Sequence, residues 1–411
     1  MPTSISKHKW QFAPRFKRGV FGWRSDLPIK RIKEALSEIK AIGKTDAPLA
    51  AGGAVLFIEK LVPSIEHVDS SSGSLGTAVN HALETLAKII AKPTVNSIQR
   101  NAWLERIWQA VQEDDYGYLS SVDDYWPMMC ATTEVGAHWA DEFGEITRSI
   151  LSNPDYRNGG YFAGESFWYA SLFAAARYDQ LLNHSHTNIK PNWSLHRWRI
   201  LSLAHLGRID EAIEYAETKV DGIAIEYLHS MCEEMLLKEG RHAEAYARFA
   251  FTANRSNSNL STLRAIAKKY PVVPPEVILE DLINHNPWEK GKWFAAAKSL
   301  GLYEQAIELV SHSPTDPNTL IRAARDFSDK QPVFAFQSGL AAMRWLLLGY
   351  GYEMTKWDLF SALKLTQQIA DVNGYSREQI QQFLLDLENE LRLKHDWFDE
   401  ALKFCTPNAP N

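Results

Sequence analysis

The sequence predicts an all-α protein, an α-solenoid of antiparallel helix pairs that follows an N-terminal helical region. Three observations predict this fold. Apolar residues recur at three- and four-residue spacing, and no stretch reads as a sheet. Short breaks marked by Pro, Gly, Asn or Asp separate these stretches, which favours antiparallel neighbours. A glycine-to-alanine element also recurs at a nearly constant interval.

The first segment, residues 1–27, is predicted to be a basic and aromatic arm. Residues 1–44 hold eleven Lys and Arg against three acids, a local charge of +8, so the rest of the −6 chain carries −14. Cations between aromatic rings are typical of segments that follow a nucleic-acid backbone and stack on bases. The candidate nucleic-acid contacts are Arg15, Lys17, Arg18, Trp23 and Arg24.

A structural role for the arm is the favoured alternative. Its aromatic side chains would pack on the first helices while its cations stay in water. The acidic body of the chain would repel a polyanion beyond the local basic patch.

Residues 28–183 are predicted to form the N-terminal helical region, with helices from Pro28 onward. Asp46 and Asp316, and prolines 274–275, mark helix starts along the chain. The serine-rich stretch 68–76 lacks the Gly-Lys-(Ser/Thr) ending of a nucleotide-binding loop. We expect there a connection in which a serine caps the next helix. Irregular stretches occur at 153–160 and 183–192, and the second is a candidate hinge.

Residues 193–405 are predicted to form the helical-repeat region. Three segments align without gaps, with glycine at 207, 240 and 301 and alanine five residues later in each. A weaker copy has Asp396 in place of the glycine and Ala401 after it. Successive spacings are 33, 61 and 95 residues, close to one, two and three units of about 32. Glycine would supply a positive-φ turn, and alanine would let the two helices cross closely.

The Gly-x-x-x-(Glu/Gln)-Ala-(Ile/Tyr) element resembles the turn and second helix of a tetratricopeptide repeat, from about Trp193 to the C-terminus. Other stretches resemble an uncharacterised family of bacterial helical proteins without an assigned activity: 67–73 (HVDSSSG), 114–117 (DDYG) and 323–327 (AARDF). The first resemblance implies a protein-binding solenoid. The second implies no catalytic residue.

Cysteine usage and hydropathy narrow the class of protein. Cys130, Cys232 and Cys405 are too widely separated for a disulfide framework or a Cys-x-x-Cys metal site. The run Phe334–Leu348, read as the most apolar, is too short to span a membrane, and the first ten residues lack a signal-peptide core. We therefore expect a cytoplasmic protein with no membrane partner.

Few residue patterns indicate chemistry. His184, His186, His196 and His205 lack a supporting carboxylate motif, so we expect surface or loop histidines, no metal and no cofactor. The acidic pairs 114–115, 123–124 and 233–234 are expected to cap or solvate helices. Seven tryptophans at helix-face spacing are expected in the core: Trp103, Trp108, Trp168, Trp198, Trp293, Trp345 and Trp357.

The functional prediction is a protein-interaction scaffold or adaptor, because the concave surfaces of helical arrays bind peptides and proteins. Its groove is expected around residues 193–310. The candidate partner contacts are Arg197, His205, Arg208, Glu214, Arg241 and Tyr246. Nucleic-acid binding through the arm is the second hypothesis. An enzyme with an unrecognised pocket is the third, and no catalytic residue is assigned.

Overall fold

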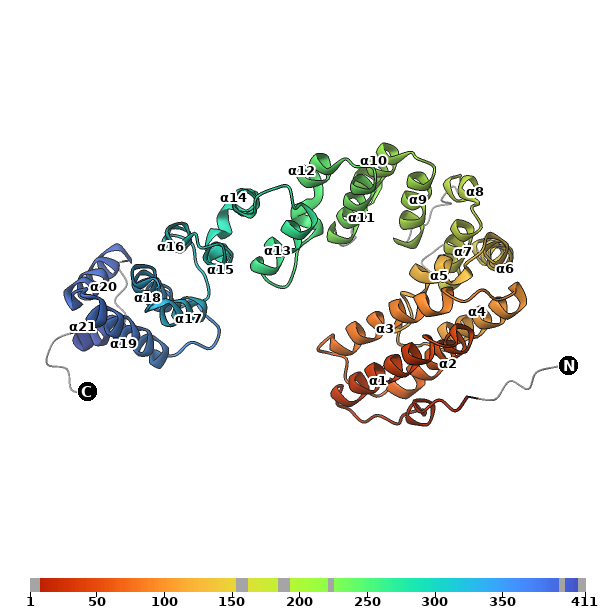
Figure 1. The fold of residues 1–411 in the computed structure, drawn as a ribbon, viewed down its shortest axis with the longest axis horizontal. Coiled ribbons are helices and arrows are strands. Elements are labelled where there is room, and N and C mark those ends of the chain that lie inside the picture. The colour runs from red at the N-terminus through yellow and green to blue at the C-terminus, as the bar shows by residue number, and fades with distance from the viewer. Residues whose placement is uncertain (1–7, 153–161, 184–192, 221–224, 392–395, 406–411) are drawn as a thin grey trace. The chain divides into compact units, whose positions relative to one another are not determined.

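The computed structural model describes residues 8–152, 162–183, 193–220, 225–391 and 396–405 (Figure 1). These residues form helices joined by short connections, with no strand among them, which confirms the all-α prediction. The chain divides into two compact units, Met1–Ile223 and Ala224–Asn411. The predicted irregular stretch 153–160 lies outside the described residues, as does the candidate hinge except for Asn183. The domain bounds 28–183 and 193–405 stay predictions.

The described helices of the first unit, in chain order, are η1 (Ala13–Arg15), α1 (Asp26–Ile42), α2 (Ala47–Ile65), α3 (Ser74–Ala91), α4 (Ser97–Gln112), α5 (Val122–Cys130), α6 (Thr133–Ser152), α7 (Ala163–Ala174), α8 (Tyr178–Leu182), α9 (Trp193–His205) and α10 (Ile209–Lys219). One hydrophobic core includes buried side chains from Trp10 to Trp198. Helix α2 contacts α1, α3 and α4, and helix α9 contacts α7, α8 and α10.

Among the described residues, one helix is long and apolar enough to cross a membrane by length and composition, and it is α2 and not the run Phe334–Leu348. Of its most apolar 18-residue window, 61% is buried inside the unit. Packing against three neighbouring helices therefore accounts for its composition. Cytoplasmic location stays a prediction.

The arm packs on α2 through its aromatic side chains. The rings of Phe12 and Phe16 lie 5.4 and 4.9 Å from the ring of Phe57. Trp10 lies against Gly53, where a Cβ atom would overlap its indole. Burial of four arm aromatics confirms the expected packing, but Trp23 is 73% exposed. Helix α1 begins at Asp26, two residues before the expected start.

The described helices of the second unit are α11 (Ile225–Lys238), α12 (His242–Ala253), α13 (Asn259–Lys269), α14 (Pro275–His285), η3 (Pro287–Trp293), α15 (Phe294–Ser299), α16 (Tyr303–Ser311), α17 (Pro317–Phe327), α18 (Pro332–Leu347), α19 (Lys356–Asn373), α20 (Arg377–Leu391) and α21 (Asp396–Cys405). Contacts join α11 with α12, α17 with α18, α18 with α19, and α20 with α21.

Several predicted helix starts are confirmed, and one cap is different. The side chains of Asp46 and Asp316 accept hydrogen bonds from first-turn amides, and Pro275 occupies the first turn of α14. The cap of α3 is Gly73, with φ of 71°, and not a serine. Glycine adopts this left-handed conformation without the steric cost that a serine would incur.

The three repeat glycines adopt the predicted positive φ, at 74°, 74° and 77° for Gly207, Gly240 and Gly301. The amide of each glycine donates to the carbonyl three residues back, and the next amide donates to the carbonyl five residues back, at 2.9, 2.9 and 3.1 Å in the three turns. This pair of bonds is a Schellman turn, which ends one helix and starts the next. The turn before Asp396 lies outside the described residues, and α21 begins at that residue.

A further turn of this kind has alanine in place of glycine. Ala176 has φ of 55°, and the amide of Arg177 donates to Leu172 at 2.9 Å. Ala176 lies 31 residues before Gly207, and Ala-Arg-Tyr-Asp there matches Gly-Arg-Ile-Asp after α9. The repeat pattern in the sequence is defined by glycine, so it does not include this turn.

Candidate functional site

Three surfaces of the molecule were candidates for function: the predicted partner contacts, a basic groove under the arm, and an aromatic pocket near the C-terminus. The groove lies in the first unit and the aromatic pocket in the second, whereas some predicted contacts belong to the first unit and some to the second.

The predicted contacts of the first unit are only partly available to a partner. Arg197 on α9 is predicted to be exposed, but its side chain is 15% exposed and paired with Asp124 of α5. Arg208 donates two hydrogen bonds to Glu211, at 2.8 and 2.6 Å. His205 and Glu214 are exposed.

Arg208 and Glu214 line the same shallow pocket, with a volume of about 390 Å³. Arg199 also lines it and lies over the ring of Tyr215, with 5.1 Å between guanidinium carbon and ring centroid. The pocket therefore brings together two predicted contacts with a cation and an aromatic ring that are not among the predicted residues.

The predicted contacts of the second unit form hydrogen bonds with other residues of the same unit. Arg241 donates to Glu244 at 2.6 Å, and Glu244 also accepts from Arg248. The hydroxyl of Tyr246 donates to Asp281 at 2.7 Å. Burial, followed by this hydrogen bond, raises the pKa of Tyr246. A partner would have to compete with these contacts.

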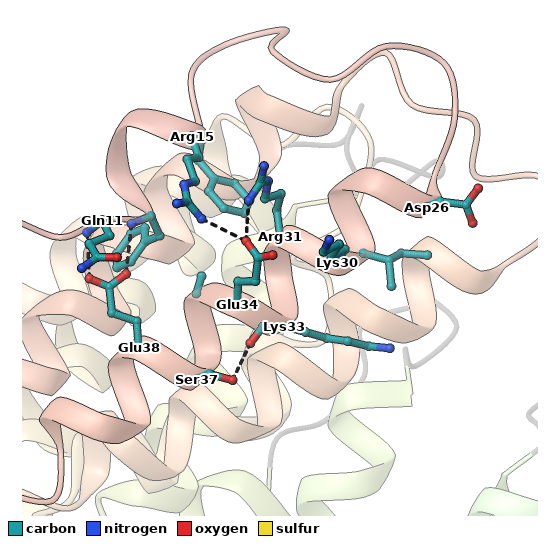
Figure 2. Close-up of a pocket in the computed structure, with 13 residues that line it drawn as sticks. Gln11, Arg15, Asp26, Lys30, Arg31, Lys33, Glu34, Ser37 and Glu38 are labelled. Carbon is teal, nitrogen blue, oxygen red and sulfur yellow. Dashed lines mark hydrogen bonds and ion pairs between the residues drawn. The ribbon is translucent and has the colours of Figure 1, made fainter.

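The basic groove lies between the arm and α1 and encloses about 720 Å³ (Figure 2). Phe12 and Phe16 contribute to its apolar lining, and Lys30 and Lys33 are exposed beside it. The three acids of residues 1–44 are Asp26, Glu34 and Glu38. Glu34 and Glu38 are engaged with the arm, and Asp26 is exposed.

Glu34 and Glu38 fasten the arm to α1, as Figure 2 shows. Glu34 accepts from Arg15 at 3.0 Å and from Arg31 at 2.6 Å. The hydrogen bond from Arg31 is the main reason that the pKa of Glu34 is lowered. Glu38 accepts the backbone amides of Gln11 and Phe12 at 2.7 and 3.0 Å.

The five predicted nucleic-acid contacts differ in whether their side chains are paired within the protein or exposed. Arg15 is paired with Glu34, and Arg18 lies 3.5 Å from Glu66. Lys17, Trp23 and Arg24 are exposed. Of the arm aromatics expected to stack on bases, only Trp23 presents its ring to solvent, because the others pack on the helices.

The aromatic pocket lies between α19 and α21 and encloses about 560 Å³. Its lining residues are Lys356, Trp357, Phe360, Ser361, Lys364, Glu400 and Phe404. Trp357 is 80% exposed, which corrects its expected place in the core; the other six tryptophans of that set are buried. The buried stripe of α19 runs through Leu359, Leu363 and Thr366, and Trp357 lies off this stripe. That offset was a signal in the sequence.

Two of the acidic pairs expected to cap or solvate helices each contribute one buried carboxylate instead. Glu233 is fully buried and accepts from Asn254 and Tyr270 at 2.7 Å each and from Lys269 at 2.5 Å. These bonds join α11, α12 and α13. Since three donors occupy the carboxylate, its role is to hold helices together.

Asp123 is the second buried carboxylate, on α5. Burial raises its pKa to about 6, against opposing effects of a hydrogen bond with Ser194 and the charge of Arg197. Both partners belong to α9, so this group couples two helices of the first unit.

The histidines are not gathered into a site in the described residues. His184 and His186 lie outside the described part of the chain. His196 is buried, contrary to expectation, and its Nδ1 lies 3.0 Å from the hydroxyl of Tyr215. Burial lowers the pKa of His196. Among the described residues, no group of three His, Cys, Asp or Glu side chains is placed to hold a metal ion.

Comparison of the chain with protein-family models, with curated proteins and with solved structures found no match. The resemblance to tetratricopeptide repeats therefore has no family assignment behind it.

Proposed function

We propose that this chain is a cytoplasmic protein-interaction scaffold, in which antiparallel, tetratricopeptide-like helix pairs stack as an α-solenoid. The observation that carries the proposal is the recurrence of one local structure. Schellman turns at Ala176, Gly207, Gly240 and Gly301 are each followed, five residues later, by a fully buried small or apolar side chain. Helix pairs of this kind bury their apolar faces on neighbours and leave polar faces for partners.

The turn alone does not carry the proposal. Gly349 makes the same turn at the end of α18, but Met354, five residues later, is only half buried. The combination of turn and buried residue is what distinguishes the four positions, because the buried residue sets how closely the second helix packs.

Affinity capture from cell extracts tests the scaffold. The intact chain should recover a protein in stoichiometric amount, and a variant with His205→Ala and Glu214→Lys should recover about tenfold less if these exposed residues contact it. Glu280→Lys, the same charge change at an exposed position of α14, is the matched control and should recover the wild-type amount. Failure of the wild-type chain to recover any protein under several growth conditions would count against the scaffold.

Nucleic-acid binding is the second candidate, favoured by the exposed cations Lys17, Arg24 and Lys30. Changing these three to Glu is a sharper test than changing Arg15 and Arg18, whose ion pairs fasten the arm. The variant should lose retention on single-stranded RNA at low salt. For the wild-type chain, the logarithm of the binding constant should fall with the logarithm of the salt concentration, with a slope of about −0.7 per phosphate contact. Arg264→Glu with Lys268→Glu, on exposed positions of α13, is the control. If nucleic acid does not retain the wild-type chain at low salt, this function is excluded.

A further inference from the structure

We propose that the aromatic pocket between α19 and α21 binds a peptide segment in which a large apolar side chain stands next to a carboxylate. This inference rests on the proposed scaffold function and names one of its binding sites. Three features support it: the exposure of Trp357, the packing of the pocket walls and the lysines that line the pocket.

Trp357 is presented to solvent at a fixed position. It lies in the first turn of α19, which a capping box formed by Thr355 and Asp358 starts. The backbone that carries the indole is therefore held by hydrogen bonds of 2.7 Å from the amide and hydroxyl of Thr355. An exposed tryptophan on a rigid helix end is the kind of residue that dominates binding energy in interfaces.

The walls of the pocket come from two helices that touch. The rings of Phe360 on α19 and Phe404 on α21 lie 5.5 Å apart. Lys356 pairs with Glu400 across the same two helices, and its ammonium lies 5.7 Å from the centroid of Phe360. The ion pair and the ring contact hold α19 and α21 together, so the apolar floor exists before a ligand arrives. A preformed floor lowers the entropic cost of binding.

The pocket carries the opposite charge to the stretch of sequence that contributes its residues. Residues 351–411 contain six Lys and Arg against ten Asp and Glu, whereas two Lys and one Glu line the pocket. Glu400 is already paired with Lys356, which leaves the exposed Lys364 beside the aromatic rings. Ser361, also exposed, lies between Trp357 and Lys364 on the helix and offers a hydroxyl donor. A carboxylate next to an apolar anchor matches this arrangement.

Selection from a random 12-residue peptide library on the intact chain tests the proposal. Enriched peptides should contain an aromatic or long aliphatic residue next to Asp or Glu. Fluorescence polarisation with the enriched peptides should show at least about tenfold weaker binding to Trp357→Ala. Trp288→Ala, which removes an 88% exposed tryptophan elsewhere in the second unit, should bind as wild type.

A charge exchange tests the carboxylate separately. Lys364→Glu should weaken the enriched peptides, and peptides in which Lys replaces their acidic residue should bind Lys364→Glu better than wild type. Absence of enrichment, equal binding to Trp357→Ala, or no effect of Lys364→Glu would each overturn the proposal. Self-association that Trp357→Ala abolishes would also overturn it, because a second copy of the chain would then occupy the pocket.

Failure of the peptide site can be distinguished from failure of the scaffold function. A cellular protein captured equally by wild type and Trp357→Ala, with no peptide enriched, leaves the scaffold standing and removes this site. Capture of no protein by either chain removes the scaffold itself.

Discussion

Asp123 and Glu233 are carboxylates that packing removes from water, and their partners differ. Three donors surround Glu233, including the ammonium of Lys269. Asp123 has a hydrogen bond with Ser194 and the charge of Arg197, but Arg197 is paired with Asp124. A buried carboxylate with so little compensation favours its protonated form.

The stability of the first unit should therefore depend on the protonation of Asp123. Its pKa is about 6 in the folded protein, above the ordinary value of 3.8. The protonated carboxyl group therefore contributes its full stabilisation of the folded state below pH 3.8, and this stabilisation is lost as the pH rises through 6. Asp123→Asn removes the ionisation and should stabilise the protein above pH 7 by up to about 3 kcal/mol. The difference should vanish near pH 4.

Urea unfolding at pH 4, 6 and 8 measures this dependence. Asp115→Asn, a change at an exposed aspartate nearby in sequence, should show no such trend. A variant Asp123→Asn that is less stable than wild type at pH 8 would mean that the folded protein uses the negative charge.

At the scale of elements, the turns between helices depend on one backbone conformation. An added Cβ at Gly207, Gly240 or Gly301 would meet no atom within 4 Å, so these glycines are required for their φ and not for space. Gly53 is the opposite case, because the space beside it is filled by Trp10 of the arm. One residue type thus supports two different features of the fold.

Substitutions in the turns should show this dependence. Gly207→Ala should destabilise the protein by about 1 kcal/mol, since a left-handed conformation costs an alanine roughly that much. Ala176→Gly should stabilise it by roughly 0.5–1 kcal/mol, because the strain at φ of 55° is relieved at some cost in chain entropy. Midpoints of urea unfolding measure both.

The helical Gly52 offers a control of opposite sign. Its neighbourhood is also open, but it lies inside α2, so Gly52→Ala should stabilise the protein by roughly 0.5–1 kcal/mol. If Gly207→Ala behaved like Gly52→Ala, the turn would not require a left-handed residue.

At the scale of the whole molecule, the charges that face solvent differ from those that the composition of each segment suggests. The basic arm is neutralised in part by acids of α1, while Lys17, Arg24 and Lys30 stay in water. The acidic C-terminal region gathers two lysines at its aromatic pocket. Sequence composition predicts net charge, but ion pairing decides which charges face a ligand.

The sequence alone determined the helical class, the positive φ of three turn glycines, the caps at Asp46 and Asp316, and the burial of most tryptophans. These features depend on residues close together in the chain, so local spacing and backbone preference suffice to predict them. Tertiary structure alone decided that Glu233 and Asp123 are buried, that Arg197 is paired and that Trp357 joins Phe404 at a pocket. Each depends on a partner from another helix, and a single sequence does not say which helices will meet.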